Sequence, residues 1–228
     1  MTSEPHVRSA LAAADDREGT AQHGSIKMTA GRSAWRPVDY LGRMRDGDIR
    51  FALREKLEVD HRGDPSTRVR EELGLCLGQT RVDVAVINGS ITGYEIKSER
   101  DRLDRLHEQV RLYGLVLDQA VLVSGSRHIR RATTLLDDWW GVWHAESDGS
   151  TIRIEEVQAP GWNTKHDPYS VAQLLWRAEA LDVLRSRGLH RGLASATRFK
   201  IWDALVEHID LDDLRAVVRG ALKARQEW

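Results

Sequence analysis

The stretch that decides the fold is Arg81-Val-Asp-Val-Ala-Val-Ile87, followed by Asn88-Gly89-Ser90 and then Ile91-Thr-Gly-Tyr-Glu-Ile-Lys97. Both seven-residue runs are rich in β-branched residues, and the short polar segment between them is typical of a turn. We therefore predict a β-hairpin. Because side chains alternate along a strand, Glu95 and Lys97 must emerge on the same face of it.

The place of Asp83 depends on the hairpin loop. A two-residue turn would pair Asp83 with Tyr94 and put it on the opposite face from Glu95. A bulged turn at 87–89 would set Asp83 diagonal to Glu95 on the same face, and a loop at 88–90 would set the two directly opposite each other. The residues alone leave these registers open.

If the two carboxylates share a face, they indicate a metal site. Asp83 and Glu95 would repel each other, and a divalent cation such as Mg²⁺, with Mn²⁺ as a substitute, relieves the repulsion by accepting both as oxygen ligands. Lys97 would then hold or polarise the water that attacks a phosphodiester. The alternative is a cross-strand ion pair of Lys97 with a carboxylate, worth under about 1 kcal/mol on an exposed face.

Hydrophobic periodicity predicts an α/β domain over residues 46–160, with a mixed central sheet flanked by helices, and a helical appendage over residues 161–228. Residues 1–45 are predicted to be a disordered tail and lead-in. Before the hairpin we expect a helix from Asp48 through Leu57 and a short helix capped by Ser66 or Thr67 and ended by Gly74. After it we expect a helix of about 15 residues carrying Leu103, Leu106, Val110 and Leu117. A strand at 120–123, a helix at 127–138 and strands at 140–146 and 151–157 complete the domain. The appendage is expected to hold helices at 170–187, 197–209 and 211–225, with Asp210 as an N-cap.

Two further groups of polar residues favour contact with nucleic acid. On the predicted helix after the hairpin, four residues fall in one angular sector and would set guanidinium, amide and phenol groups beside a phosphate backbone: Arg102, Arg105, Gln109 and Tyr113. Arg198 and Lys200 belong to a basic cluster in the appendage that would grip a nucleic acid locally. The alternative for the first group is an exposed helix rim.

Composition limits the kinds of partner and cellular compartment that we expect. The 228 residues are 41% apolar, which suffices for a core, and the formal net charge of -1 excludes a global basic field, so nucleic-acid contact must be local. Cys76 is the single cysteine, which rules out an internal disulfide and fits a reduced, cytoplasmic compartment. Because no apolar run reaches about 20 residues, we expect no membrane partner.

These motifs resemble the PD-(D/E)XK nuclease superfamily: Asp83, then Glu95-Ile-Lys97, then the Gln109-xxx-Tyr113 element of its RecB and lambda-exonuclease branches. From about residue 46 to 228 the chain is also similar to a bacterial and phage family known by an "sce" locus-tag name. The runs that match it are Arg81-Val-Asp83, Gly93-Tyr-Glu-Ile-Lys97, Trp139-Trp-Gly-Val142 and Leu174-Leu-Trp-Arg-x-Glu-Ala-Leu181.

The resemblance implies a restriction-endonuclease-like core and an Mg²⁺-dependent deoxyribonuclease, with RNA not excluded as substrate and a homodimer as one form. It implies metal ligation by Asp83, Glu95, the Ile96 carbonyl and a helical acidic ligand, for which we choose Glu72. Catalytic support would come from Lys97 and Gln109. Val82 stands where a proline would precede the aspartate, a frequent variation. Because this fold also hosts inactive members, the alternative is a nucleic-acid-binding or adaptor module without catalysis.

Overall fold

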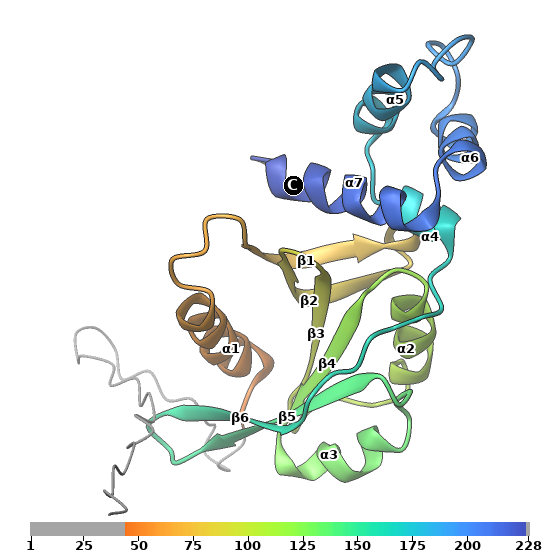
Figure 1. Cartoon of the computed structure of the whole chain (residues 1–228). Helices are drawn as coiled ribbons and strands as arrows, with labels where there is room; N and C mark the ends of the chain where they lie inside the picture. The colour runs from red at the N-terminus through yellow and green to blue at the C-terminus, as the bar shows by residue number, and fades with distance from the viewer. Residues whose placement is uncertain (1–43, 227–228) are drawn as a thin grey trace, which may run out of the picture.

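A computed structural model of the protein describes residues 44–226. Its centre is a six-stranded sheet in which the strands lie in chain order (Figure 1). The strands are β1 (Arg68–Leu75), β2 (Thr80–Ile87), β3 (Ile91–Lys97), β4 (Gln119–Ser124), β5 (Trp140–Ser147) and β6 (Ile152–Gln158). The predicted tail at residues 1–45 lies outside the described residues, except for its last two.

The sheet is mixed, and its parallel strands require helical crossover connections. β3, β4 and β5 run parallel, while the β1–β2, β2–β3 and β5–β6 pairs are antiparallel. A parallel pair needs a crossover connection, and the helices α2 (Leu106–Gly114) and α3 (Ser126–Thr133) provide the two that β3, β4 and β5 require. The predicted class, α/β with a mixed central sheet flanked by helices, is confirmed.

The hairpin takes one of the three predicted registers. Ile87 pairs with Ile91 and Val84 with Tyr94, so the loop is 88–90 and Asp83 falls opposite Glu95, one step beyond the last pair. At this step the two strands part: β2 continues beside β1, and β3 continues beside β4. We call the opening between them the fork.

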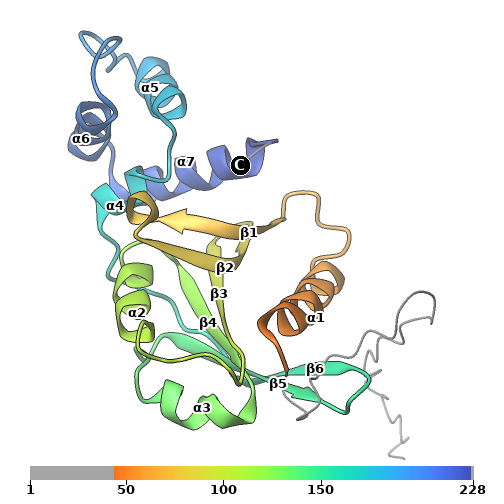
Figure 2. The same ribbon diagram turned by 180° about the vertical axis from the view of Figure 1, so that it is seen from behind.

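Helices cover both faces of the sheet (Figures 1 and 2). The first, α1 (Asp46–Asp60), was predicted from its apolar spacing, and Ile49, Leu53 and Leu57 indeed pack with one face of the sheet. α2 and α3 lie on the other face, where Leu106 and Ala132 join a larger apolar cluster.

Some predicted elements were wrong. The short helix expected to end at Gly74 is the strand β1, because this segment pairs along its length with β2, and such tertiary pairing overrides a local capping signal. α2 has nine residues rather than about 15, with Leu103 and Leu117 buried in the flanking loops. α3 ends at Thr133 rather than Asp138.

The appendage consists of short helices, of which the last two match the prediction closely. The segment expected to be one helix at 170–187 is split in two. The four helices are α4 (Pro168–Ala172), α5 (Arg177–Ser186), α6 (Arg198–His208) and α7 (Leu211–Ala224). Asp210 caps α7 as predicted, since its carboxylate accepts the backbone N–H of Asp213 at 3.0 Å.

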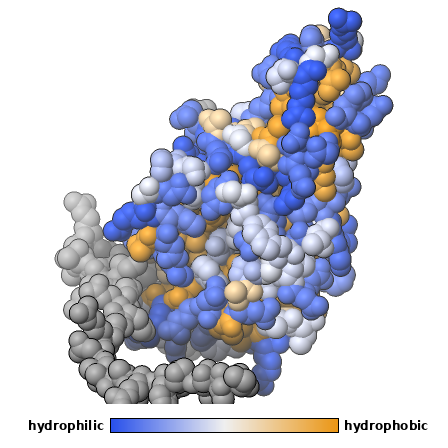
Figure 3. Space-filling model, in the orientation of Figure 1, coloured by the Kyte–Doolittle hydropathy of each residue, from blue (hydrophilic) through white to orange (hydrophobic). Residues whose placement is uncertain are grey.

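The appendage packs on the sheet rather than standing apart. Buried side chains such as Val171, Trp202 and Val218 join the same apolar cluster as Leu73 and Tyr113 of the core. α7 crosses the end of the sheet at β2, and α5 and α6 project beyond it (Figure 1). In the space-filling view, apolar residues show more densely on this projecting part than on the rest of the face (Figure 3).

Asp118, just before β4, joins appendage and core through a buried charge cluster. Its side chain is 3% exposed and accepts two bonds from Arg215 of α7 and one, at 2.6 Å, from the backbone N–H of Ile91. His166 Nε2 lies 3.2 Å from the same carboxylate. Burial raises the pKa of Asp118, but the hydrogen bonds from His166, Arg215 and the Ile91 amide outweigh it and hold the pKa below its ordinary value.

Within residues 44–226, no helix is both long and apolar enough to span a bilayer.

We expect Asp118→Ala to lower the free energy of unfolding by about 3 kcal/mol, because it leaves the Arg215 guanidinium and the Ile91 amide without their buried acceptor. Asp212→Ala is the matched control, since Asp212 pairs with the same arginine at the surface. Urea unfolding followed by circular dichroism measures both. A loss no larger than that of the control would contradict the role of this cluster.

The same cluster predicts a pH dependence. Because the folded-state pKa of Asp118 is depressed, its stabilisation is full above the unfolded aspartate pKa of about 3.9 and is lost as the pH falls through the lower, folded-state value. The difference in unfolding free energy between the wild type and Asp118→Ala should therefore shrink below about pH 4. A difference that stays constant down to about pH 2.5 would refute this assignment.

Candidate active site

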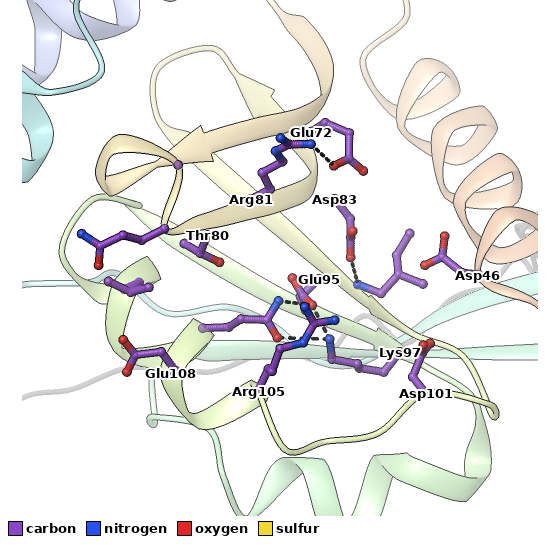
Figure 4. A pocket seen from close by; sticks show the side chains of 15 residues that line it. Asp46, Glu72, Thr80, Arg81, Asp83, Glu95, Lys97, Asp101, Arg105 and Glu108 are labelled. Atoms are coloured by element: carbon purple, nitrogen blue, oxygen red, sulfur yellow. Dashed lines mark hydrogen bonds and ion pairs between the residues drawn. The ribbon is translucent and has the colours of Figure 1, made fainter.

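A cleft of about 510 Å³ opens at the fork between β2 and β3 (Figure 4). Six carboxylates line it, against three cationic side chains, so the cleft is acidic although the chain is nearly neutral. The carboxylates are Asp46, Glu72, Asp83, Glu95, Asp101 and Glu108, and the cations are Arg81, Lys97 and Arg105.

Glu95 is the most deeply buried charged group of the cleft. It is 1% exposed, and its Oε1 accepts Lys97 Nζ at 2.5 Å and Gln109 Nε2 at 2.6 Å. Its Oε2 accepts the hydroxyl of Tyr113, which also lies 2.7 Å from the Arg81 carbonyl. Gln109 Oε1 in turn accepts Lys97 Nζ at 3.1 Å, so three side chains hold this carboxylate in one orientation.

Burial governs the electrostatics of this cluster. It raises the pKa of Glu95, nearby Asp83 raises it further, and Lys97 acts against both. The pKa of the Tyr113 hydroxyl is also raised by burial and by the Glu95 carboxylate, so the phenol keeps its proton and donates it. A bound cation would stabilise a buried carboxylate beside a second acid, because it accepts both as oxygen ligands.

Asp83 lies where β2 and β3 separate, and its side chain bridges the two sides of the fork. Its Oδ2 accepts the backbone N–H of Ile96 at 2.7 Å, where a strand-to-strand bond would otherwise be. Its Oδ1 accepts Arg50 Nη2 from α1 at 2.8 Å, and Arg50 Nη1 also donates to the Asp83 carbonyl at 2.8 Å. The aspartate is therefore held from β3 and from α1 together.

Arg50 is the site residue that the sequence analysis missed. It contacts Asp46 and Glu72 in addition to Asp83, so one guanidinium neutralises three acids at the rim of the cleft. Its one sequence signal is the four-residue spacing from Asp46, which is common on exposed helices. Burial raises the pKa of Asp46, and Arg50 works against that shift.

Glu72 does not lie on a helix, as we had predicted for the third acidic ligand. It lies in β1, opposite Asp83 in the β1–β2 register, and has a φ of 55°. A non-glycine residue in this region is strained, and such strain gathers at functional sites. Its carboxylate is half exposed and paired with Arg50 at 3.0 Å, so it reaches the cleft from the strand.

The donor set of the cleft fits a hard divalent cation. Asp83 and Glu95 supply carboxylate oxygens at the fork, and Ile96, whose backbone N–H donates to Asp83, lines the same cleft. Residues 44–226 contain no group of three or more His, Cys, Asp or Glu side chains already gathered around one point. Arg50 and Lys97 hold the carboxylates instead, so a cation would take over contacts that these two side chains make.

The residues predicted to contact nucleic acid are not all in one place. Arg105 precedes α2 and lines the cleft, and Arg102 is exposed beside it, paired with Asp104. Tyr113 is fully buried, so its contact is with Glu95 rather than with a ligand at the surface. Arg198 and Lys200 are exposed on α6, at the far end of the appendage from the cleft (Figures 1 and 2).

The forked sheet and the acidic cleft define a mixed α/β protein with a candidate cation site at the divergence of two central strands. A family model described as Bacteriophage P4 protein cII matches residues 43–227, and the chain belongs to this family. It is 22% identical over 182 residues to protein cII of Enterobacteria phage P4, an alignment that covers 80% of this chain and 68% of the relative. No solved structure matches the chain.

Arg50→Ala should change how the cleft responds to cations. In EDTA we expect it to lower the free energy of unfolding by about 2 kcal/mol, because three carboxylates lose a shared charged donor. Addition of Mg²⁺ should then raise the melting temperature more than it does in the wild type, since a ligand that binds the folded state stabilises it.

Differential scanning fluorimetry with and without about 10 mM Mg²⁺, roughly a thousandfold above the protein, makes the comparison. Arg54→Ala is the matched control, because Arg54 lies one turn further along α1 and pairs with Glu58 and Glu71 outside the cleft. The same Mg²⁺ response in all three proteins would contradict a cation site beside Arg50.

Proposed function

We propose that the protein is a metal-dependent nuclease of the PD-(D/E)XK type, with a restriction-endonuclease-like core, that hydrolyses phosphodiester bonds in DNA. The observation that carries the proposal is the buried Glu95 carboxylate. Lys97, Gln109 and Tyr113 hold it in place, directly across the fork from Asp83. This arrangement supports the resemblance in every residue of the Asp83, Glu95-Ile-Lys97 and Gln109-xxx-Tyr113 motifs.

Asp83, Glu95 and the Ile96 carbonyl would hold Mg²⁺, for which Mn²⁺ substitutes. When bound, the cation supplies stabilisation of the negative charge that develops on the phosphate. Glu72 supports the site from β1, as an acid next to Asp83 in register rather than as a ligand on a helix.

The protein's own side chains supply orientation and proton handling. Lys97 Nζ is bonded to Glu95 and Gln109, so it is fixed in direction and is positioned to donate a hydrogen bond to an attacking water. Tyr113 and Gln109 restrict Glu95 to a single orientation. Arg105, at the mouth of the cleft, attracts the phosphate that is to be cleaved.

The charge of the cleft supports metal dependence. Six carboxylates against the three lining cations and Arg50 leave the cleft with a net negative charge, which would repel a polyanion. A bound divalent cation would offset the charge of Asp83 and Glu95. Without the cation, the carboxylates oppose the entry of a phosphodiester into the cleft itself.

A second candidate function, a nucleic-acid-binding or adaptor module without catalysis, is favoured by one observation. Arg50 already neutralises Asp83, Asp46 and Glu72, which is the arrangement expected of a cleft that keeps its fold without needing a metal. The two candidates differ in one result, metal-dependent cleavage.

DNA is the proposed substrate class, with RNA as the alternative substrate, and the cytoplasm is the proposed compartment. A homodimer is the proposed form for cleavage of both strands of a duplex, since each chain carries one cleft of this kind in its described residues.

We expect Asp83→Ala and Glu95→Gln each to reduce cleavage by at least about 100-fold, because each removes a charge that the cation needs. Glu95→Gln keeps a side chain that still bonds to Tyr113 and so preserves the packing. The measurement is cleavage of labelled single- and double-stranded DNA and RNA with Mg²⁺, Mn²⁺ or EDTA.

Glu108→Gln is the matched control. Glu108 lines the same cleft, but it is exposed and paired with Arg111, so its loss should leave cleavage within a few-fold of the wild type. Cleavage that survives in both site variants, or that proceeds in EDTA, would rule out the proposed chemistry. Absence of cleavage by the wild type on every substrate would favour the binding module.

A further inference from the structure

A second surface lies next to the cleft and carries the opposite charge. The loop that follows β3, residues 98–105, contains Arg100, Arg102 and Arg105, and it forms a shallow cavity with Lys97 that adjoins the cleft. Both cavities share Lys97, Asp101 and Arg105. This loop therefore borders the acidic cleft.

The helix α3 extends the same surface. Arg127 Nη1 donates to the Glu99 carbonyl at 2.5 Å, which ties the start of α3 to the loop. Figure 4 shows α3 below the loop, on the side where Lys97 and Asp101 reach the cleft. Residues 97–105 and 126–134 together hold seven cationic side chains against three carboxylates, in a chain with a net charge of -1.

The arginines of α3 point in one direction. At about 100° per residue, Arg127, Arg130 and Arg131 occupy one sector of about 100°, opposite Ala132, the buried residue of this helix. All three arginines are exposed, and none has a carboxylate within ion-pair distance among residues 44–226. Elsewhere the arginines of α1, α2 and α7 are paired: Arg50, Arg54, Arg111 and Arg215.

Exposed guanidinium groups without a carboxylate partner, gathered on one face, favour a polyanion, and their positive charge attracts the phosphates of a nucleic acid. Arg127 and Arg131 lie about 6 Å apart along the helix axis, so their guanidinium groups can reach neighbouring phosphates of one strand. The exposed face of α3 has no apolar side chain to insert, as binding to a lipid surface would require. A nucleic-acid backbone is therefore the occupant that the charges fit.

We propose that the exposed arginines of α3, together with the loop 98–105, bind the phosphate backbone of a nucleic acid and lead it into the cleft. This inference rests on the proposed function, because it assigns the substrate's path to that same site. It also moves the main contact away from Arg198 and Lys200, which lie at the opposite end of the molecule (Figures 1 and 2). There Arg198 is stacked over Phe199 and Trp202, at 5.2 and 5.5 Å.

The test compares two charge reversals of equal size in the full chain. Arg130→Glu with Arg131→Glu changes α3, and Arg198→Glu with Lys200→Glu changes the appendage. Binding of a fluorescein-labelled duplex DNA of about 20 base pairs, and of its single-strand and RNA counterparts, is measured by anisotropy in EDTA over a range of salt concentrations. EDTA prevents cleavage, so the readout is affinity alone.

We expect the α3 variant to bind at least about tenfold more weakly, and the slope of log affinity against log salt to fall by about 2, since each phosphate that the protein no longer neutralises lowers the slope by about one unit. The appendage variant should stay within about twofold of the wild type in both quantities. Arg130→Lys with Arg131→Lys keeps the charge and should retain most of the affinity. Melting temperatures confirm that all variants are folded.

Unchanged affinity in the α3 variant, equal losses in both reversals, or loss of affinity in the lysine variant would each overturn the inference, as would a wild type that binds no nucleic acid. The proposed function fails differently. A wild type that binds through α3 but cleaves nothing with Mg²⁺ or Mn²⁺ supports this surface and contradicts the nuclease. A wild type that cleaves DNA, but whose affinity is unchanged by the α3 substitutions, supports the nuclease and contradicts the α3 surface.

Discussion

The parting of β2 from β3 is the constraint on which the rest of the structure depends. Beyond the Val84–Tyr94 pair, β2 remains with β1 and β3 with β4, so backbone groups on both inner edges lose their strand partners. Buried backbone groups must be satisfied, and side chains do it here. Asp83 accepts the Ile96 amide, and the Tyr113 hydroxyl lies within hydrogen-bond distance of the Arg81 carbonyl. Two side chains that shape the cleft thus also close the edges of the fork.

Local patterns were sufficient to predict most of the sheet and part of the site. The β-branched runs on either side of Asn88-Gly89-Ser90 predicted the hairpin, and strict alternation placed Glu95 with Lys97. The spacing of Gln109 and Tyr113 brought both to Glu95, because α2 is regular over this range. The register could not be predicted, since the loops considered differ by small backbone changes while each would keep a plausible apolar pattern.

What the sequence did not reveal came from contacts between distant segments. β1 had the signals of a capped helix, and only its pairing with β2 makes it a strand. Arg50 is separated from Asp83 by 33 positions, and nothing in the polar face of α1 distinguishes it from Arg54. Likewise, α3 was predicted as a helix, but its arginines matter because the loop after β3 folds against its first turn.

The charge cluster at Asp118 has a consequence for how the chain must fold. Arg215 belongs to the last helix of the described chain, yet its partners, Asp118 and through it Ile91, border the central strands. The apolar cluster that α7 completes is the one against which α2 packs. During synthesis, the strands of the sheet therefore leave the ribosome before α7, the helix that completes this cluster. Until α7 leaves the ribosome, the part of the apolar cluster that α7 covers stays exposed, and Asp118 lacks its Arg215 partner.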